Sequence, residues 1–256
     1  MLSPQETAHF DTFGFLFLPR LFSAAEIRAV RDAAEEIWRE DPAPVKDGDR
    51  RLTYFVERSE PLARLVEDDR IYRRVEALLG PRFVWVGSEG NVTYYSELKW
   101  HSDRKYYRRG EERWMGYPQL KVMLYLDEVT RQTGCMRVIP GSHRMPFHKA
   151  LGPQEIDPDS RPFGVAGADI PSVALESTPG DVILFNHCIW HAMFGGEEGR
   201  CYIALKFAAR PTTEDHLRTL ERYTESAFEP HPAFLDSESP RLRNMVAGLA
   251  ERKIKV

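Results

Sequence analysis

Apolar and polar positions repeat with two different periods along the chain, and the change of period divides it into three parts. Before residue 80, apolar residues recur at helical spacing, as in Ile27, Val30, Ala34 and Ile37, which predicts a helix with one apolar face. From about residue 81 to 210, short β-branched and aromatic runs are separated by Gly, Pro and Asp. Such runs are typical of a sandwich or a barrel. Helical patterns return after residue 210.

Two capping boxes place the first helices. Ser3 and Glu6 form one box, with a proline at the first helical position, and the helix is expected to end near Gly14. Ser23 and Glu26 form the second box and begin a second helix. The second helix is interpreted as an outer support of the fold, not as part of a site.

The remaining elements follow from the same patterns. Strands are predicted at 15–19, 51–56, 83–86, 92–95, 120–126, 135–139, 173–175, 182–185 and 200–207. Further helices are predicted within 61–79, 213–225 and 240–253. The simplest interpretation is a single domain over residues 1–256. It has a β core at about 81–210 and helical flanks at 1–80 and 211–256.

Composition narrows the class of protein. The chain has 256 residues, 42% hydrophobic and 29% charged, with a net charge of −4, so nucleic acid is not an expected partner. No apolar run approaches the ~18 residues of a membrane span, and the N-terminus does not resemble a signal peptide. Three cysteines without paired spacing fit a reducing compartment. A cytoplasmic protein without membrane partners is predicted, and its oligomeric state is not indicated.

The most distinctive chemistry lies at His101 and Asp103. On a strand, residues i and i+2 point to the same face, so an imidazole and a carboxylate can reach one divalent metal ion. The pair alone is also common as a polar surface pair, and a third ligand must come from elsewhere. His187 and His191 are the candidates, because both follow the strand at 182–185. If the extended alternation continues through them, they share a face, so periodicity does not choose between them.

Arg200 begins the strand at 200–207, in which Cys201 and Ile203 alternate with Arg200 and Tyr202. A guanidinium binds a carboxylate through two parallel hydrogen bonds. Arg200 near a metal site therefore predicts a carboxylate clamp. Without the histidines, an exposed arginine at the end of a hairpin is the better interpretation.

Taken together, these residues resemble the phytanoyl-CoA dioxygenase family of Fe(II)- and 2-oxoglutarate-dependent oxygenases. Four segments match the family in order. They are Phe10 to Pro19 with the helix start at 23–26, Trp100-His101-Ser102-Asp103, Leu124 to Asp127 with Thr133 to Arg144, and Gly180 to Phe185 with His191 and Arg200.

The resemblance implies a mainly β fold with helical flanks, a double-stranded β-helix (a cupin-like jelly roll) that holds iron inside it. It implies that His101, Asp103 and His191 bind Fe(II), and that Arg200 holds the distal carboxylate of 2-oxoglutarate. Thr93 and Asn91 fall near positions where the family contacts this co-substrate, although ordinary strand residues are an equal alternative. Family members often have serine where this chain has Met193, which puts that contact in doubt. His143 is expected to brace its turn.

The implied reaction consumes O2 and 2-oxoglutarate, releases succinate and CO2, and hydroxylates an aliphatic C–H bond of a small molecule. Asp103 fills the position that related halogenases leave to halide, which favours hydroxylation; desaturation and ring formation stay open.

Two other classes of protein are alternatives. One is a non-catalytic jelly-roll protein that binds a metal or ligand, and the other is a zinc hydrolase or cupin-type enzyme. Neither class needs a carboxylate clamp such as Arg200. The basic stretch 104–113 favours an anionic substrate if it borders the pocket, and is otherwise a solvated loop.

Overall fold

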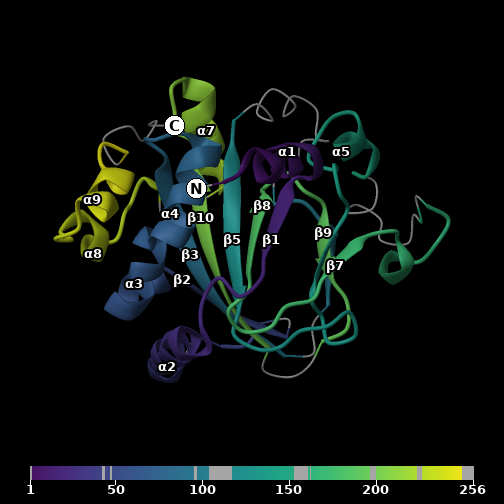
Figure 1. Cartoon of the computed structure of the whole chain (residues 1–256), viewed down its shortest axis with the longest axis horizontal. Helices are drawn as coiled ribbons and strands as arrows, with labels where there is room; N and C mark the ends of the chain where they lie inside the picture. The colour runs from purple at the N-terminus through teal and green to yellow at the C-terminus, as the bar shows by residue number, and fades with distance from the viewer. Residues whose placement is uncertain are drawn as a thin grey trace.

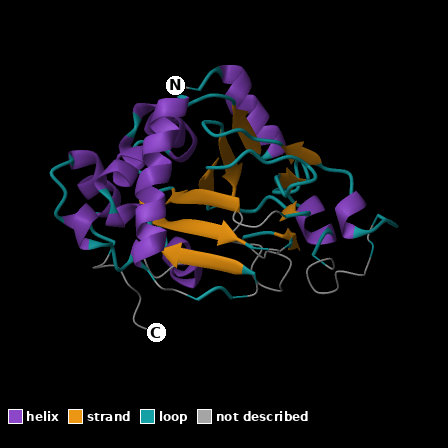
Figure 2. Ribbon diagram, turned by 90° about the horizontal axis from the view of Figure 1, so that it is seen from below, coloured by secondary structure: helices purple, strands orange, loops and turns teal. Residues whose placement is uncertain are grey.

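The protein is represented by a computed structural model, which describes residues 2–41, 44–46, 48–94, 97–103, 117–152, 161, 163–196, 200–223 and 227–249. The basic stretch 104–113 lies outside these residues. Two antiparallel sheets face each other, and most helices lie on the outer side of the larger sheet (Figure 1). The turned view of Figure 2 shows the helices gathered beside that sheet. This architecture agrees with the predicted mainly β fold.

Each sheet combines strands from distant parts of the chain. The larger sheet has the order β1 (Phe15–Leu18), β8 (Val182–Asn186), β5 (Gln119–Tyr125), β10 (Arg200–Ala208), β3 (Val84–Thr93) and β2 (Asp49–Thr53). The smaller sheet has the order β4 (Leu98–His101), β9 (His191–Met193), β6 (Met136–Val138) and β7 (Val173–Leu175).

The helices occupy the two ends of the chain and one connection. They are α1 (Pro4–Phe13), α2 (Ala24–Glu40), α3 (Glu60–Glu67), α4 (Asp69–Leu79), α5 (Phe147–Ala150), α7 (Glu214–Tyr223), α8 (Pro232–Leu235) and α9 (Pro240–Val246). Short 3-10 turns lie at η1 (Val56–Arg58) and η3 (Gly167–Asp169).

Both predicted capping boxes are present. The Ser3 and Ser23 hydroxyls accept hydrogen bonds from the backbone N–H groups of Glu6 and Glu26. The two glutamates accept in return from the backbone N–H groups of the serines. Gly14 ends α1 with φ +85°, a conformation that glycine adopts without strain. The first helices are thus defined by local sequence.

The large sheet differs from the prediction in two ways. The separate runs at 83–86 and 92–95 are replaced by one ten-residue strand, β3, and two strands from the expected helical flank, β1 and β2, form its edges. The glycines of β3 do not end the strand, and Gly90 serves close packing. A Cβ on Gly90 would lie 2.3 Å from the Phe55 ring, so the absent side chain makes room for this buried aromatic residue.

Alternation along the strands separates an apolar outer face of the large sheet from an inner face that carries both apolar and charged side chains. On β5, Leu120, Val122 and Leu124 belong to the core between the large sheet and the helices. Met123 belongs to the core between the two sheets. Lys121 shares the inner face with Met123, because side chains repeat with a period of two. The inner face therefore carries a charge deep in the fold, where the site lies.

Cys135, Cys188 and Cys201 are all buried, and the described residues form no disulfide. Among the residues described here, no helix is both long and apolar enough to cross a lipid bilayer.

We expect Gly90→Ala to destabilise the protein by about 1–3 kcal/mol, the usual cost of overpacking a core, because the new methyl group meets the Phe55 ring. Urea unfolding monitored by circular dichroism measures the change. Gly167→Ala is the matched control: its Cβ would meet only ordinary contacts, the nearest being Phe194 at 3.4 Å. Equal stability of the two variants would show that Phe55 can move aside.

Candidate metal centre

Three potential metal ligands meet between the two sheets. Strand β4 pairs with β9 so that His101 lies directly opposite His191, and Asp103 follows two residues after His101. One ligand atom from each of the three lies within 4.8 Å of the others. A 2-His-1-carboxylate set of this kind suits Fe(II) and leaves coordination positions open. The structure thus brings together the three residues that the family resemblance implies.

A β-bulge sets the direction of His101. Between the pairs Leu98–Met193 and His101–His191, strand β4 has one residue more than β9. Such a bulge re-aims the side chains that follow it. Ser102 points away from the site, and its hydroxyl donates a hydrogen bond of 3.2 Å to the His187 carbonyl oxygen.

The outer nitrogen of each ligand histidine is engaged with the backbone. Nδ1 of His101 lies 2.8 Å from the Lys99 carbonyl oxygen, and Nδ1 of His191 lies 3.0 Å from the Ile189 carbonyl oxygen. Carbonyl oxygens only accept hydrogen bonds, so Nδ1 carries the proton in both rings. Nε2 is then the unprotonated nitrogen, which is the form that binds a metal.

His187 does not join this group. The extended alternation that would align it with His191 does not continue: Asn186 begins a turn, its side-chain oxygen accepting from the Cys188 N–H and its carbonyl oxygen from the Ile189 N–H. His187 is fully buried within that turn. His191 follows it at the start of β9 and faces His101.

The charges of the site favour metal binding. Burial and the neighbouring His101 lower the pKa of His191 to about 3, so its imidazole is neutral at neutral pH. Burial alone would raise the pKa of Asp103, but Lys121, with its Nζ 3.0 Å from the carboxylate, and the nearby histidines hold this pKa well below its usual value. A neutral imidazole and an ionised carboxylate are the forms that ligate metals.

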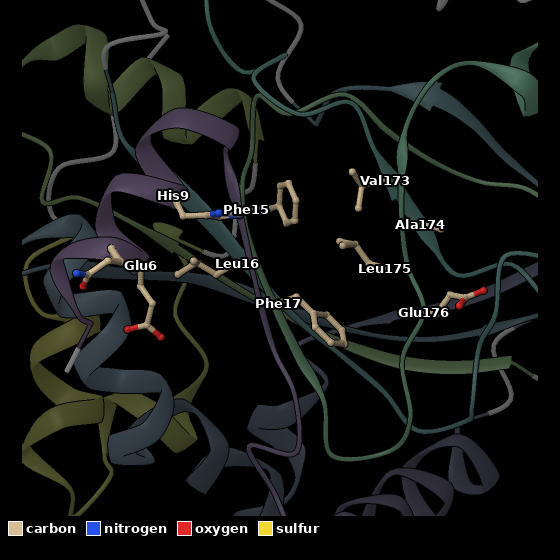
Figure 3. A pocket seen from close by; sticks show the side chains of 10 residues that line it. Glu6, His9, Phe15, Leu16, Phe17, Val173, Ala174, Leu175 and Glu176 are labelled. Carbon is tan, nitrogen blue, oxygen red and sulfur yellow. The ribbon is translucent and has the colours of Figure 1, made fainter.

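The ligands open into a cavity of about 120 Å³, which we call the chamber. Its lining is mixed in charge and consists of Asp49, Arg51, Glu89, Asn91, Leu98, His101, Asp103, Lys121, Met123, Met136, Phe185, His191, Met193 and Tyr202. A second cavity of about 560 Å³ opens between α1 and β1 on one side and β7 on the other. Figure 3 shows its largely apolar walls, Phe15 and Phe17 across from Val173 and Leu175. The metal-ligating group found among the described residues lies in the chamber.

Arg200 offers one edge of its guanidinium to a ligand. Nη1 donates a 2.7 Å hydrogen bond to the Gly134 carbonyl oxygen. Nη2 has a weak acceptor, the Met193 sulfur at 3.7 Å, and the buried Nε has no hydrogen-bond partner among the described residues. Nε–H and Nη2–H point the same way and match the two oxygens of a carboxylate. This edge fits an end group of 2-oxoglutarate.

Gly134 makes this position of Arg200 sterically accessible. Gly134 has φ +89°, and a Cβ there would lie 1.6 Å from Nη1 of Arg200. Any larger residue would displace the guanidinium. The Thr133-Gly134 pair in the sequence is thus explained by the packing of Arg200.

The two further co-substrate candidates have different surroundings. Asn91 is buried in the chamber wall, and neither its amide oxygen nor its amide nitrogen has a hydrogen-bond partner among the described residues. Thr93 lies opposite Arg200 on the neighbouring strand, but its hydroxyl donates a 3.2 Å hydrogen bond to Asp49. Asn91 therefore has unused hydrogen-bonding capacity, whereas Thr93 is engaged.

Sequence reasoning missed several charged residues of the inner face. Lys121 lies opposite Lys206 on adjacent strands, and Glu89 contacts both Lys206 and Arg51. The available signal was a charged residue within an otherwise apolar strand, as in Leu120 to Leu126. His143, in contrast, has its expected bracing position: Nε2 lies 3.2 Å from the Asp11 carbonyl oxygen of α1.

Comparison with known proteins gives a consistent result. Residues 10–195 match the family model described as phytanoyl-CoA dioxygenase. The ectoine dioxygenase of Sphingopyxis alaskensis is 27% identical over 224 residues, covering 76% of this chain and 71% of the relative.

Two solved structures are also similar. HygX from Streptomyces hygroscopicus, with nickel and 2-oxoglutarate bound, has a TM-score of 0.70 at 23% identity and covers 84% of this chain and 90% of its own. EctD from S. alaskensis, with bound Fe, has a TM-score of 0.61 at 25% identity. The match covers 81% of this chain and 77% of EctD. These likenesses confirm the predicted jelly-roll fold.

We expect His191→Ala to weaken Fe(II) or Co(II) binding by more than about 100-fold. Loss of a residue that only hydrogen-bonds a metal ligand costs about 10- to 100-fold in affinity, and loss of the ligand itself should cost more. His187→Ala should keep metal affinity, because His187 lies outside the group of ligands. Anaerobic calorimetric titration with either metal measures both variants, and circular dichroism checks their folding. Loss of metal by a folded His187→Ala with retention by His191→Ala would exchange the two assignments.

Proposed function

The chain belongs to the phytanoyl-CoA dioxygenase family and is an Fe(II)- and 2-oxoglutarate-dependent dioxygenase, and we propose that it hydroxylates an aliphatic C–H bond of a small molecule. The observation that supports this proposal best is that a set of metal ligands and an arginine suited to a carboxylate lie near the same chamber. Three metal ligands converge in the chamber, and Nη2 of Arg200 contacts the sulfur of Met193, a residue of the chamber wall.

We assign His101, Asp103 and His191 as the iron ligands, acting through Nε2 of each histidine and a carboxylate oxygen of Asp103. The protonation states of His191 and Asp103 allow binding without a change of charge at neutral pH. The bound iron supplies the oxidising chemistry with O2 and 2-oxoglutarate. The protein contributes position and electrostatics.

Arg200 is assigned to the distal carboxylate of 2-oxoglutarate, with its Nε and Nη2 as donors. Nη1 is held by the Gly134 carbonyl oxygen, so the guanidinium is oriented before the ligand arrives. Asn91 is a second candidate contact, because its buried amide needs a partner. Thr93 is retained as a neighbour that positions Asp49. Met193 contributes a sulfur beside Arg200.

Hydroxylation is the proposed outcome because Asp103 occupies a ligand position. A chain without this carboxylate would leave room for halide. Desaturation and ring closure use the same ligands, so product analysis separates them: hydroxylation adds one oxygen atom to the substrate, and the alternatives remove two hydrogen atoms. We also propose that the protein acts in the cytoplasm, on the basis of its three cysteines, which form no disulfide among the described residues.

We expect the purified protein to convert 2-oxoglutarate to succinate and CO2 when it is supplied with Fe(II), O2 and ascorbate. Chromatography of succinate measures the reaction, and His191→Ala should reduce it to background. A non-catalytic metal-binding protein would give no succinate. If the iron-loaded protein also failed to bind 2-oxoglutarate by calorimetry, the proposed activity would be wrong.

Arg200→Ala should weaken 2-oxoglutarate binding by about 10- to 100-fold, since a hydrogen bond to a charged group contributes about 1.5–3 kcal/mol. Iron affinity should change less than about threefold, because Arg200 is no metal ligand. Calorimetric titrations with each ligand give the two values. Arg137→Ala is the control: this buried arginine donates to the carbonyl oxygens of Ala168 and Arg131 and does not line the chamber. A parallel loss of both affinities in Arg200→Ala would indicate a structural role.

A further inference from the structure

The cavity of about 560 Å³ between α1, β1 and β7, which we call the side cavity, has no part in the function proposed above. It opens at the seam of the sandwich, because β1 is an edge strand of the large sheet and β7 an edge strand of the small sheet. Phe15 and Phe17 form one wall, and Val173 and Leu175 form the other (Figure 3). Walls of this kind favour an apolar occupant.

The polar residues around the side cavity serve local structure. Glu6 belongs to the capping box of α1. The Glu176 carboxylate accepts a 2.8 Å hydrogen bond from the backbone N–H of Arg131. The His9 ring packs edge-on against the Phe15 ring, with 5.3 Å between the ring centroids. The apolar walls therefore set the character of the cavity.

Strand pairing connects the side cavity to the chamber. In the large sheet, Phe15 of β1 lies opposite Phe185 of β8. In the small sheet, Leu175 of β7 lies opposite Met136 of β6, which in turn lies opposite Met193 of β9. The first residue of each row lines the side cavity, and the later ones line the chamber. Because opposite residues of antiparallel strands have neighbouring side chains on one face, each row runs from one cavity wall to the other.

The side chains between the two cavities form a dry layer. They belong to one apolar core cluster, and their exposure falls from 7% at Phe15 to 1% at Phe185 and from 4% at Leu175 to 0% at Met136. Water and ions lose their hydrogen bonds in such a layer, whereas apolar spaces take up apolar guests. The Phe185 ring centroid lies 5.2 Å from that of the ligand His191. The layer therefore reaches the metal centre.

This layer can let a very small molecule pass. Methionine is unbranched and has three rotatable bonds, and side chains of a close-packed core still exchange rotamers. The gaps that open in this way suit a diatomic molecule and not a co-substrate. The chamber, in contrast, has a volume of about 120 Å³ and is lined by charged residues such as Asp49, Arg51 and Glu89. In the proposed function it also has to hold 2-oxoglutarate.

We propose that dioxygen reaches the metal centre from the side cavity, through the apolar layer of Phe15, Phe185, Leu175 and Met136. Dioxygen fits this path because it is diatomic, uncharged and apolar, and because a dioxygenase consumes it. The inference rests on the dioxygenase activity and is independent of the primary substrate and of the product. It leaves the charged chamber to the co-substrate and the primary substrate.

Nuclear relaxation of methionine methyl groups tests this path, because paramagnetic O2 speeds the relaxation of any methyl group that it approaches. The full-length protein, labelled with ¹³C-methyl methionine, is loaded with 2-oxoglutarate and with Zn(II), a diamagnetic stand-in for Fe(II), and is compared under nitrogen and under O2 pressure. We expect the effect of O2 at Met136 and Met193 to be at least about twofold that at Met245, since an apolar cavity concentrates an apolar gas. Met245 is 1% exposed in the core between the large sheet and the helices, and is the buried reference.

Bulky side chains in the side cavity should block the path. Val173→Trp and Leu175→Trp each place an indole group there, and the effect of O2 at Met136 and Met193 should fall to that of the reference methyl group. Val173 is 41% exposed, so this variant should fold even if Leu175→Trp does not, and circular dichroism checks both. Leu235→Trp is the matched control on an exposed position of α8, outside the residues that line the side cavity, and should change nothing.

Three results would overturn the proposal. The first is an O2 effect at Met136 and Met193 no larger than that at Met245. The second is an effect at Met193 that persists in a folded Val173→Trp, since the chamber would then receive O2 by another path. The third is an organic molecule that native mass spectrometry finds on the wild type and not on Val173→Trp, which would assign the cavity to that molecule. None of these measurements requires turnover, so a failure of the proposed function would appear separately, in the succinate assay.

Discussion

The pairing of β4 with β9 is the constraint on which the site depends. Only in this register does His101 face His191, and the bulge in β4 supplies the extra residue that achieves it. A shift by one residue would turn the side chains of β4 to the opposite face. The carbonyl oxygens that fix each Nδ1–H lie two residues before the histidines, so the same strands that place the rings also set their tautomers.

Around this pairing, the inner face of the large sheet collects several buried charged side chains. The outer face of the large sheet packs against helices through an apolar core, and the inner face holds Lys121, Lys206 and Glu89. Buried charges cost free energy unless they are paired. Apolar cores on both sides of the large sheet stabilise the fold, and the chamber on the inner side is left for binding. An enzyme that binds a dianion and a divalent metal requires such a chamber.

Local sequence predicted many elements, and the misses have physical causes. The capping boxes at Ser3 and Ser23 located two helices because their hydrogen bonds span only three residues. Gly87 and Gly90 suggested an interruption where β3 is continuous, because the need for glycine at 90 arises from Phe55, which is distant in sequence. Periodicity alone could not decide whether His187 or His191 is the third ligand, because a turn at Asn186 breaks the alternation.

The sequence by itself determined the kinds of ligand and their order: a histidine and a carboxylate at spacing two, a later histidine, and an arginine after it. These depend on local spacing and on resemblance to a family. Only the tertiary structure decided which charges meet. Lys121 with Asp103, Lys206 with Glu89 and Arg200 with Gly134 are contacts between different strands or loops. Such contacts follow from sheet register, which no single segment specifies.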